Sequence, residues 1–137
     1  MARIICIDYG AKRCGLAVTD PLQIIATALT TIDTKELFNF LSDYFSKEQV
    51  ELILIGEPLN LDNTPTDATP LVQKAMVDLA KKFPQIPIQT IDERYSSKNA
   101  VKAMVEMGMT KKDRRDKKNI DRVAATMLLQ EYLSNRS

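Results

Sequence analysis

The chain has 137 residues, the usual size of one domain, and its 45% apolar and 27% charged residues are typical of a globular protein. Lys and Arg number 19 against 18 Asp and Glu, which gives a formal net charge of +1. The sequence contains no histidine, and this excludes Ser–His–Asp and Cys–His catalysis and zinc sites that need imidazole.

The same features indicate a single domain over residues 1–137 and a cytoplasmic location. No apolar stretch approaches about 18 residues, so no membrane-spanning helix is expected. The first residues lead directly into a predicted strand, so no signal peptide is expected. Cys6 and Cys14 both lie in apolar runs, and we expect two buried thiols rather than a disulfide.

Charge is distributed unevenly along the chain. Residues 1–93 carry 8 basic and 13 acidic side chains, whereas residues 94–137 carry 11 basic and 5 acidic ones. The densest basic stretch runs from Lys111 to Lys118. A solvated loop or helix end explains such a run when it stands alone, but acidic metal ligands nearby would favour a phosphate-binding patch.

Apolar runs and helical periodicity predict three strands followed by alternating helices and strands. The expected strands cover residues 3–7, 14–19, 24–32, 51–55 and 87–91. The expected helices cover residues 35–47 with Thr34 as the cap, 69–83, 96–108, and the segment from 120 onward. The short break after the first strand favours an antiparallel hairpin. We therefore expect an α/β protein with one mixed five-stranded sheet and helices on both faces.

Acidic residues stand where the strands of this sheet end. Ligands of open α/β sheets bind outside the carboxyl ends of the parallel strands. Asp8, Glu57 and Glu93 follow the first, fourth and fifth strands, and Asp121 lies at the edge of the apolar stripe of the last helix. Carboxylates in one crevice repel each other unless a cation neutralises them, and an oxygen-only ligand set selects Mg²⁺ or Mn²⁺. Such ions promote phosphodiester cleavage without a histidine base.

Each carboxylate also has a structural explanation. Asp8 could bind the backbone of its own turn, although a charge directly after a buried strand is unfavourable without a role. Glu93 and Asp121 could form surface salt bridges, and Glu57 is expected to be solvated or structural more often than a ligand. The spacing of Asp8–Gly15 also resembles the phosphate loop of actin-like sugar kinases, but those proteins need two such domains.

Four motifs, in the right order, resemble those of the YqgF family. The motifs are Asp8–Gly15 (DYGAKRCG), Gly56–Asn60 (GEPLN), Asp92–Ser97 (DERYSS) and Asp121–Ala125 (DRVAA). The resemblance covers nearly the whole chain. Members of the family are small bacterial proteins of the ribonuclease H-like superfamily. They have been described as Holliday junction resolvases and as nucleases for the 5′ end of pre-16S ribosomal RNA.

The resemblance implies a ribonuclease H-like fold with strand order 3-2-1-4-5 and a catalytic metal site formed by Asp8, Glu93 and Asp121. Related RuvC-type resolvases have a carboxylate ligand near the position of Glu57, which makes Glu57 a candidate fourth ligand. We therefore predict an endonuclease dependent on Mg²⁺ or Mn²⁺. The expected substrate is a ribosomal RNA precursor. The alternatives are cleavage of branched DNA, and a nucleic-acid-binding ribosome assembly factor that does not cut.

Basic side chains are expected to hold the nucleic acid backbone beside this site. They are Lys12, Arg13, Arg94, Lys111, Lys112, Arg114, Arg115, Lys117 and Lys118. The expected partners are pre-rRNA and ribosomal precursor particles, with no membrane. The sequence leaves open whether the protein is a monomer or a homodimer.

Overall fold

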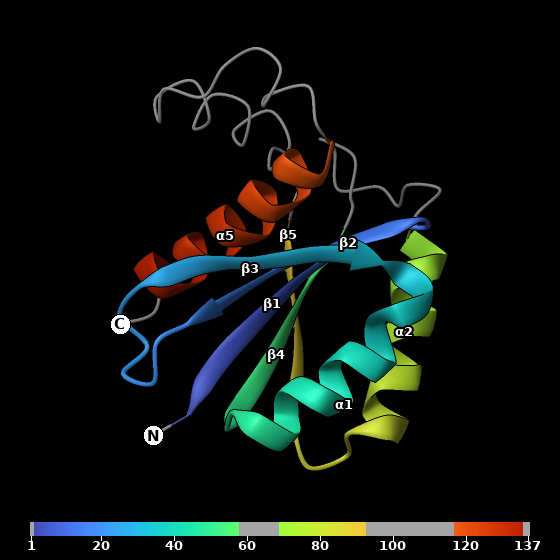
Figure 1. Cartoon of the computed structure of the whole chain (residues 1–137), viewed down its shortest axis with the longest axis horizontal. Helices are drawn as coiled ribbons and strands as arrows, with labels where there is room; N and C mark the ends of the chain where they lie inside the picture. Colours follow the sequence, from blue (N-terminus) through green and yellow to red (C-terminus); the bar gives the residue numbers. More distant parts are fainter. Residues whose placement is uncertain (1, 58–68, 93–116, 136–137) are drawn as a thin grey trace.

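The computed structural model describes residues 2–57, 69–92 and 117–135, which form a β-sheet with helices on both faces (Figure 1). The strands are β1 (Arg3–Tyr9), β2 (Arg13–Thr19), β3 (Ala26–Asp33), β4 (Val50–Glu57) and β5 (Ile88–Asp92). The helices are the 3₁₀ turn η1 (Thr34–Glu36), α1 (Leu37–Lys47), α2 (Thr69–Lys82) and α5 (Lys117–Asn135). The helix expected over residues 96–108 lies outside the described residues.

The five strands are arranged in the order β3-β2-β1-β4-β5. β2 runs antiparallel to both β1 and β3, whereas β1, β4 and β5 are parallel. Only Gly10–Lys12 separate β1 from β2, a connection too short for a parallel return. The predicted strand order and the antiparallel second strand are therefore confirmed.

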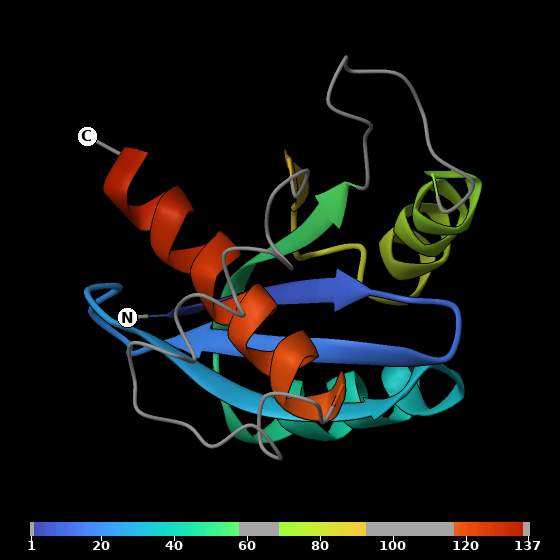
Figure 2. The same cartoon turned by 90° about the horizontal axis from the view of Figure 1, so that it is seen from above.

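The alternation of side chains along β1 builds two hydrophobic cores, one on each face of the sheet. Ile5 and Ile7 belong to the core under α1 and α2, and Ile4 and Cys6 to the core under α5 (Figure 2). All four side chains are buried, and each large one stabilises the fold by about 1.5–3 kcal/mol. A one-residue slip would exchange these faces, so the register of β1 is strongly determined.

Two predictions at the ends of elements were wrong. Thr34 does not cap α1 with its side chain: a 3₁₀ turn precedes the helix, and the Thr34 hydroxyl bonds the carbonyl of Gly10 instead. β3 begins at Ala26 rather than at residue 24, because the carboxylate of Asp20 accepts the backbone N–H groups of Ile24 and Ile25. Those two residues therefore belong to the loop.

The last helix also differs from its predicted form. α5 begins at Lys117, three residues before the expected start, so the last two residues of the basic stretch belong to the helix. Its buried face includes Ala125 and Leu129, whereas Val123 and Met127 are only half-buried. Ala124 and Ala125 are both buried, and their small side chains leave few atoms between the helix and the sheet. α5 packs across β1, β2 and β3.

Cys6 and Cys14 are both buried thiols, as predicted. None of the described helices is long and apolar enough to cross a membrane.

Candidate active site

Asp8 is a half-buried carboxylate at the carboxyl end of β1. Ile4 and Cys6 precede it at two-residue intervals and face α5, so the alternation of the strand directs Asp8 to the same face. It pairs across the ladder with Gly15 of β2. The fold therefore places this carboxylate on the face covered by α5 and outside both hydrophobic cores.

The parallel strands bring the other predicted positions to the same edge of the sheet. Ile7 is in register with Ile55, and Glu57, the last residue of β4, is in register with Asp92, the last residue of β5. Glu93 follows Asp92 directly in the sequence. β1, β4 and β5 thus end together, which is where ligands of such sheets bind.

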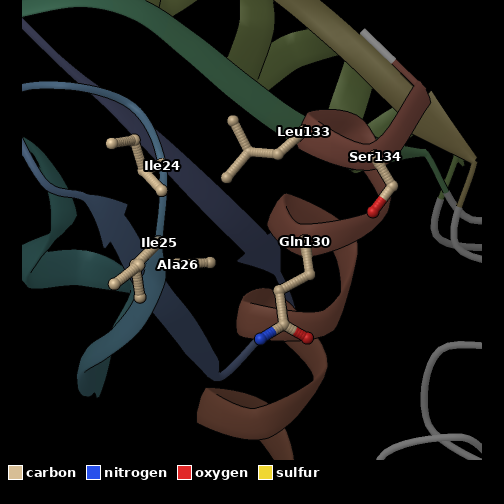
Figure 3. A pocket seen from close by; sticks show the side chains of 6 residues that line it. All are labelled: Ile24, Ile25, Ala26, Gln130, Leu133 and Ser134. Carbon is tan, nitrogen blue, oxygen red and sulfur yellow. The ribbon is translucent and has the colours of Figure 1, made fainter.

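The orientation of α5 brings its first turns toward this edge. Its last turns, with Gln130 and Leu133, line a hollow together with Ile25 of the β2–β3 loop, at the opposite edge (Figure 3). The 12 helical steps from Asp121 to Leu133 span about 18 Å, close to the roughly 20 Å length of a seven-residue strand such as β2. The backbone at Asp121 therefore lies toward the end of the sheet that carries Asp8. Figure 2 shows the first turns of α5, in orange, on the side where the β1 arrow ends.

The turn between β1 and β2 presents two predicted phosphate contacts beside Asp8. Lys12 is exposed and Arg13 is half-buried at the start of β2. Gly10 is required in this turn, because a Cβ atom there would lie 2.5 Å from the carbonyl oxygen of Arg13. Lys12 and Arg13 thus follow Asp8 by only a few residues, on either side of the start of β2.

Thr34 anchors this turn, a role that the sequence analysis missed. Its hydroxyl donates to the Gly10 carbonyl at 2.6 Å and lies 3.4 Å from the sulfur of Cys14. Its backbone N–H donates to the Lys12 carbonyl at 3.0 Å. A threonine just before a predicted helix indicates a cap, and nothing in the local sequence indicates a bond to a turn 24 residues away.

Tyr9 lies beside Asp8 in the sequence but on the other face of the sheet, against the core under α1 and α2. Burial raises the pKa of the Tyr9 hydroxyl, and nearby Cys14 and Asp78 raise it further. The hydroxyl is therefore protonated at neutral pH and does not supply a base. This leaves Asp8 as the acidic group that β1 contributes to the site.

The structure describes only part of the predicted site. Asp8, Lys12 and Arg13 have described side chains, whereas Glu57 and Asp121 are placed by their backbone alone, as are Lys117 and Lys118. The remaining predicted residues lie outside the described part of the chain: Glu93, Arg94, Lys111, Lys112, Arg114 and Arg115. Among the described side chains, no group of three Asp, Glu, Cys or His residues could hold a metal ion.

A mixed five-stranded sheet in the order β3-β2-β1-β4-β5 with helices on both faces is a ribonuclease H-like fold. The family model described as RuvX, Holliday junction resolvase, matches residues 2–135. The chain belongs to this family, which places it among the nucleases. The resemblance to the YqgF family is thereby confirmed.

Curated relatives match over almost their whole length. A protein of Christiangramia forsetii is 49% identical over 133 residues, covering 97% of this chain and 98% of its own. A protein of Bacteroides thetaiotaomicron is 44% identical over 136 residues, covering 99% of each. Both carry the name "Putative pre-16S rRNA nuclease".

A solved structure shares the fold. RuvC of T. thermophilus in complex with a Holliday junction substrate superposes with a TM-score of 0.57 at 15% identity, covering 99% of this chain and 96% of RuvC. At this identity the likeness concerns the fold alone. It agrees with the strand order and with the helices on both faces of the sheet.

Proposed function

We propose that this protein is an endonuclease that hydrolyses pre-16S rRNA near its 5′ end, with Mg²⁺ or Mn²⁺ held by Asp8, Glu93 and Asp121. The observation that carries the proposal is the position of Asp8. Its half-buried carboxylate stands at the edge where β4 and β5 also end and toward which α5 begins. The names of the curated relatives support the substrate.

The chemistry of these residues fits a hard divalent cation. All three proposed ligands are carboxylates, they come from separate segments of the chain, and the sequence has no histidine to favour a softer metal. Glu57, at the end of β4, is retained as a candidate fourth ligand. The bound ion would stabilise the negative charge that develops on the phosphodiester oxygens.

The remaining residues of the site bind and orient the substrate. Lys12 and Arg13 follow Asp8 by only a few positions and carry the positive charge that attracts a phosphate backbone. The bonds from Thr34 to Gly10 and Lys12 fix the turn that presents them. A turn held in place by other elements loses little freedom when substrate binds, which favours productive alignment.

Branched DNA is the second candidate substrate, because the family description names the Holliday junction. A direct comparison separates the two. Purified protein is incubated with an RNA that carries the 5′ leader of the 16S precursor and, separately, with a four-way DNA junction, each with Mg²⁺ and with a chelator. We expect site-specific cleavage of the RNA that stops in chelator. Cleavage of the junction alone would favour a resolvase, and binding without any cleavage would favour an assembly factor.

A further inference from the structure

The 3₁₀ turn η1 is bonded to the turn between β1 and β2 that carries the predicted phosphate contacts. The backbone N–H of Thr34, the first residue of η1, donates to the Lys12 carbonyl at 3.0 Å, and the Thr34 hydroxyl donates to the Gly10 carbonyl at 2.6 Å. The hydroxyl bond joins segments 24 residues apart in the chain. Lys35 follows Thr34 directly, so a third basic residue lies next to the turn of Lys12 and Arg13.

Lys35 lies at the edge of the sheet that carries Asp8. Asp8 pairs with Gly15 of β2, and Gly15 pairs with Thr31 of β3. Two strand spacings of about 4.8 Å therefore separate Asp8 from Thr31. Lys35 follows Thr31 by four residues, which reach at most about 14 Å along the direction of the strand. The backbone of Lys35 is thus roughly 10 to 17 Å from Asp8, which suits a phosphate a few nucleotides from the one that is cleaved.

The side chains of Lys12 and Lys35 are both exposed and available for a ligand. Among the described residues, neither ammonium group has an ion-pair partner. Lys47 differs, because it pairs with Asp43 one helical turn away on α1 at 3.1 Å. An exposed lysine that has no carboxylate partner can bind the phosphate oxygens of a nucleic acid backbone without first breaking an ion pair.

Two exposed acidic residues lie within two positions of Lys35. Asp33 is paired with Arg13 across the ladder of β2 and β3. Glu36 follows Lys35 in η1, where successive side chains point about 120° apart because a 3₁₀ turn has three residues. The segment is therefore close to neutral as a whole. Attraction of a phosphate to this segment depends on a local contact with Lys35 rather than on net charge, which salt screens over about 10 Å.

We propose that Lys35 and Lys12 form one phosphate-binding surface that holds the RNA backbone on the β3 side of the site, a few nucleotides from the cleaved bond. The inference rests on the proposed function and adds to it a residue and a direction for the bound strand. The bonds of Thr34 fix η1 against the turn, so little backbone freedom is lost when RNA binds. The contact supplies affinity and register rather than chemistry.

Fluorescence anisotropy with a labelled RNA that carries the 5′ leader of the 16S precursor tests the inference. The titrations are made in chelator at two salt concentrations, so that binding is measured without cleavage. Lys35→Ala should raise the dissociation constant about fivefold near 0.1 M salt and flatten the slope of log K against log salt by about 0.7. Lys35→Arg keeps the charge and should bind like the parent. Lys81→Ala is the matched control, because Lys81 is exposed in the last turn of α2, away from the carboxyl ends of the strands.

A charge exchange separates a local contact from an effect of net charge. Lys35→Glu/Glu36→Lys leaves the net charge of the chain unchanged and moves the positive side chain by one residue, so it should bind RNA no better than Lys35→Ala. Parent affinity in Lys35→Ala or in the exchanged chain would overturn the inference. So would an equal loss in Lys81→Ala, or weakening seen only with a four-way DNA junction. A parent that binds the RNA but never cleaves it would refute the nuclease function and leave the binding result standing.

Discussion

Asp8 is the residue on which the proposed chemistry depends most directly. It stands near the end of β1, where Ile4 to Ile7 are fully buried in the two cores and Asp8 itself is only half-buried. Replacement by asparagine preserves the shape of the side chain and removes its charge. Loss of one charged ligand should weaken the binding of a divalent cation far more than it changes packing.

Asp8→Asn should therefore reduce Mg²⁺-dependent cleavage by orders of magnitude while the fold survives. The checks are single-turnover cleavage of the RNA substrate, Mn²⁺ binding followed by electron paramagnetic resonance, and thermal unfolding without metal. An Asp43→Asn variant, altered at an exposed carboxylate on α1 away from this turn, is the control and should keep the activity of the parent. Unchanged metal binding and cleavage in the Asp8→Asn protein would exclude Asp8 as a ligand.

Thr34→Val should lower the free energy of unfolding by about 1–2 kcal/mol, because the Gly10 carbonyl loses its hydroxyl donor. Urea unfolding measures this change. Cleavage should also fall at subsaturating substrate, since the turn that presents Lys12 and Arg13 is less well fixed. Thr27→Val, at an exposed position of β3, removes a hydroxyl without touching the turn. If both variants unfold at the same urea concentration as the parent, Thr34 does not anchor the turn.

At the scale of elements, the sequence was most informative where burial is regular. The apolar runs at β1 and β4 predicted strands buried on both faces, because such strands have a continuous run of apolar residues, and both strands lie inside the sheet. The buried face of α5 was harder to predict. Alanine and larger apolar residues occur on several sides of this helix, and only packing against the sheet determines which of them are buried. The role of Thr34 depends on a bond to a turn 24 residues away, which local patterns do not reveal. Asp20, in contrast, bonds the backbone N–H groups of its own loop.

The basic segment Lys111–Lys118 is proposed to bind phosphates rather than to take part in chemistry. Arg114→Ala/Arg115→Ala should weaken binding to all sequences, and the slope of log K against log salt should flatten by about 0.7 per lost contact on single strands. Cleavage at saturating substrate should change little. Binding titrations at two salt concentrations measure both quantities. The parent's affinity at both concentrations would show that the segment is only solvated surface.

The β2–β3 loop should loosen in acid. Backbone hydrogen bonds, chiefly from Ile25, hold the pKa of the Asp20 carboxylate below its usual value, although partial desolvation opposes them. A carboxyl group whose pKa is lowered by folding stabilises the folded loop fully at a pH above the ordinary pKa of the group. This stabilisation is lost as the pH falls through the lowered pKa. The NMR chemical shifts of the Ile24 and Ile25 amides should change with pH in a single titration whose pKa lies below the ordinary aspartate range. An Asp20→Asn variant should lack it, and a titration that persists there would assign the effect elsewhere.

At the scale of the whole molecule, two opposite edges of one sheet carry different features. Asp8 and the ends of β4 and β5 occupy one edge, and the apolar loop with its hollow occupies the other. The fold explains why the sequence predicted the first edge: strand order and direction bring Asp8 and Glu57 to the same end of the sheet, although they are far apart in the chain. The assignments of Glu93, Asp121 and the basic residues beyond Arg13 remain predictions.

The processing of 16S rRNA in the host tests the central claim most directly. The protein is depleted and the 5′ ends of 16S rRNA are mapped, with the parent chain or the Asp8→Asn variant supplied in its place. The account predicts that 5′-extended precursors accumulate on depletion, that the parent restores mature ends, and that the variant does not. Normal 5′ ends after depletion, or full restoration by Asp8→Asn, would contradict it.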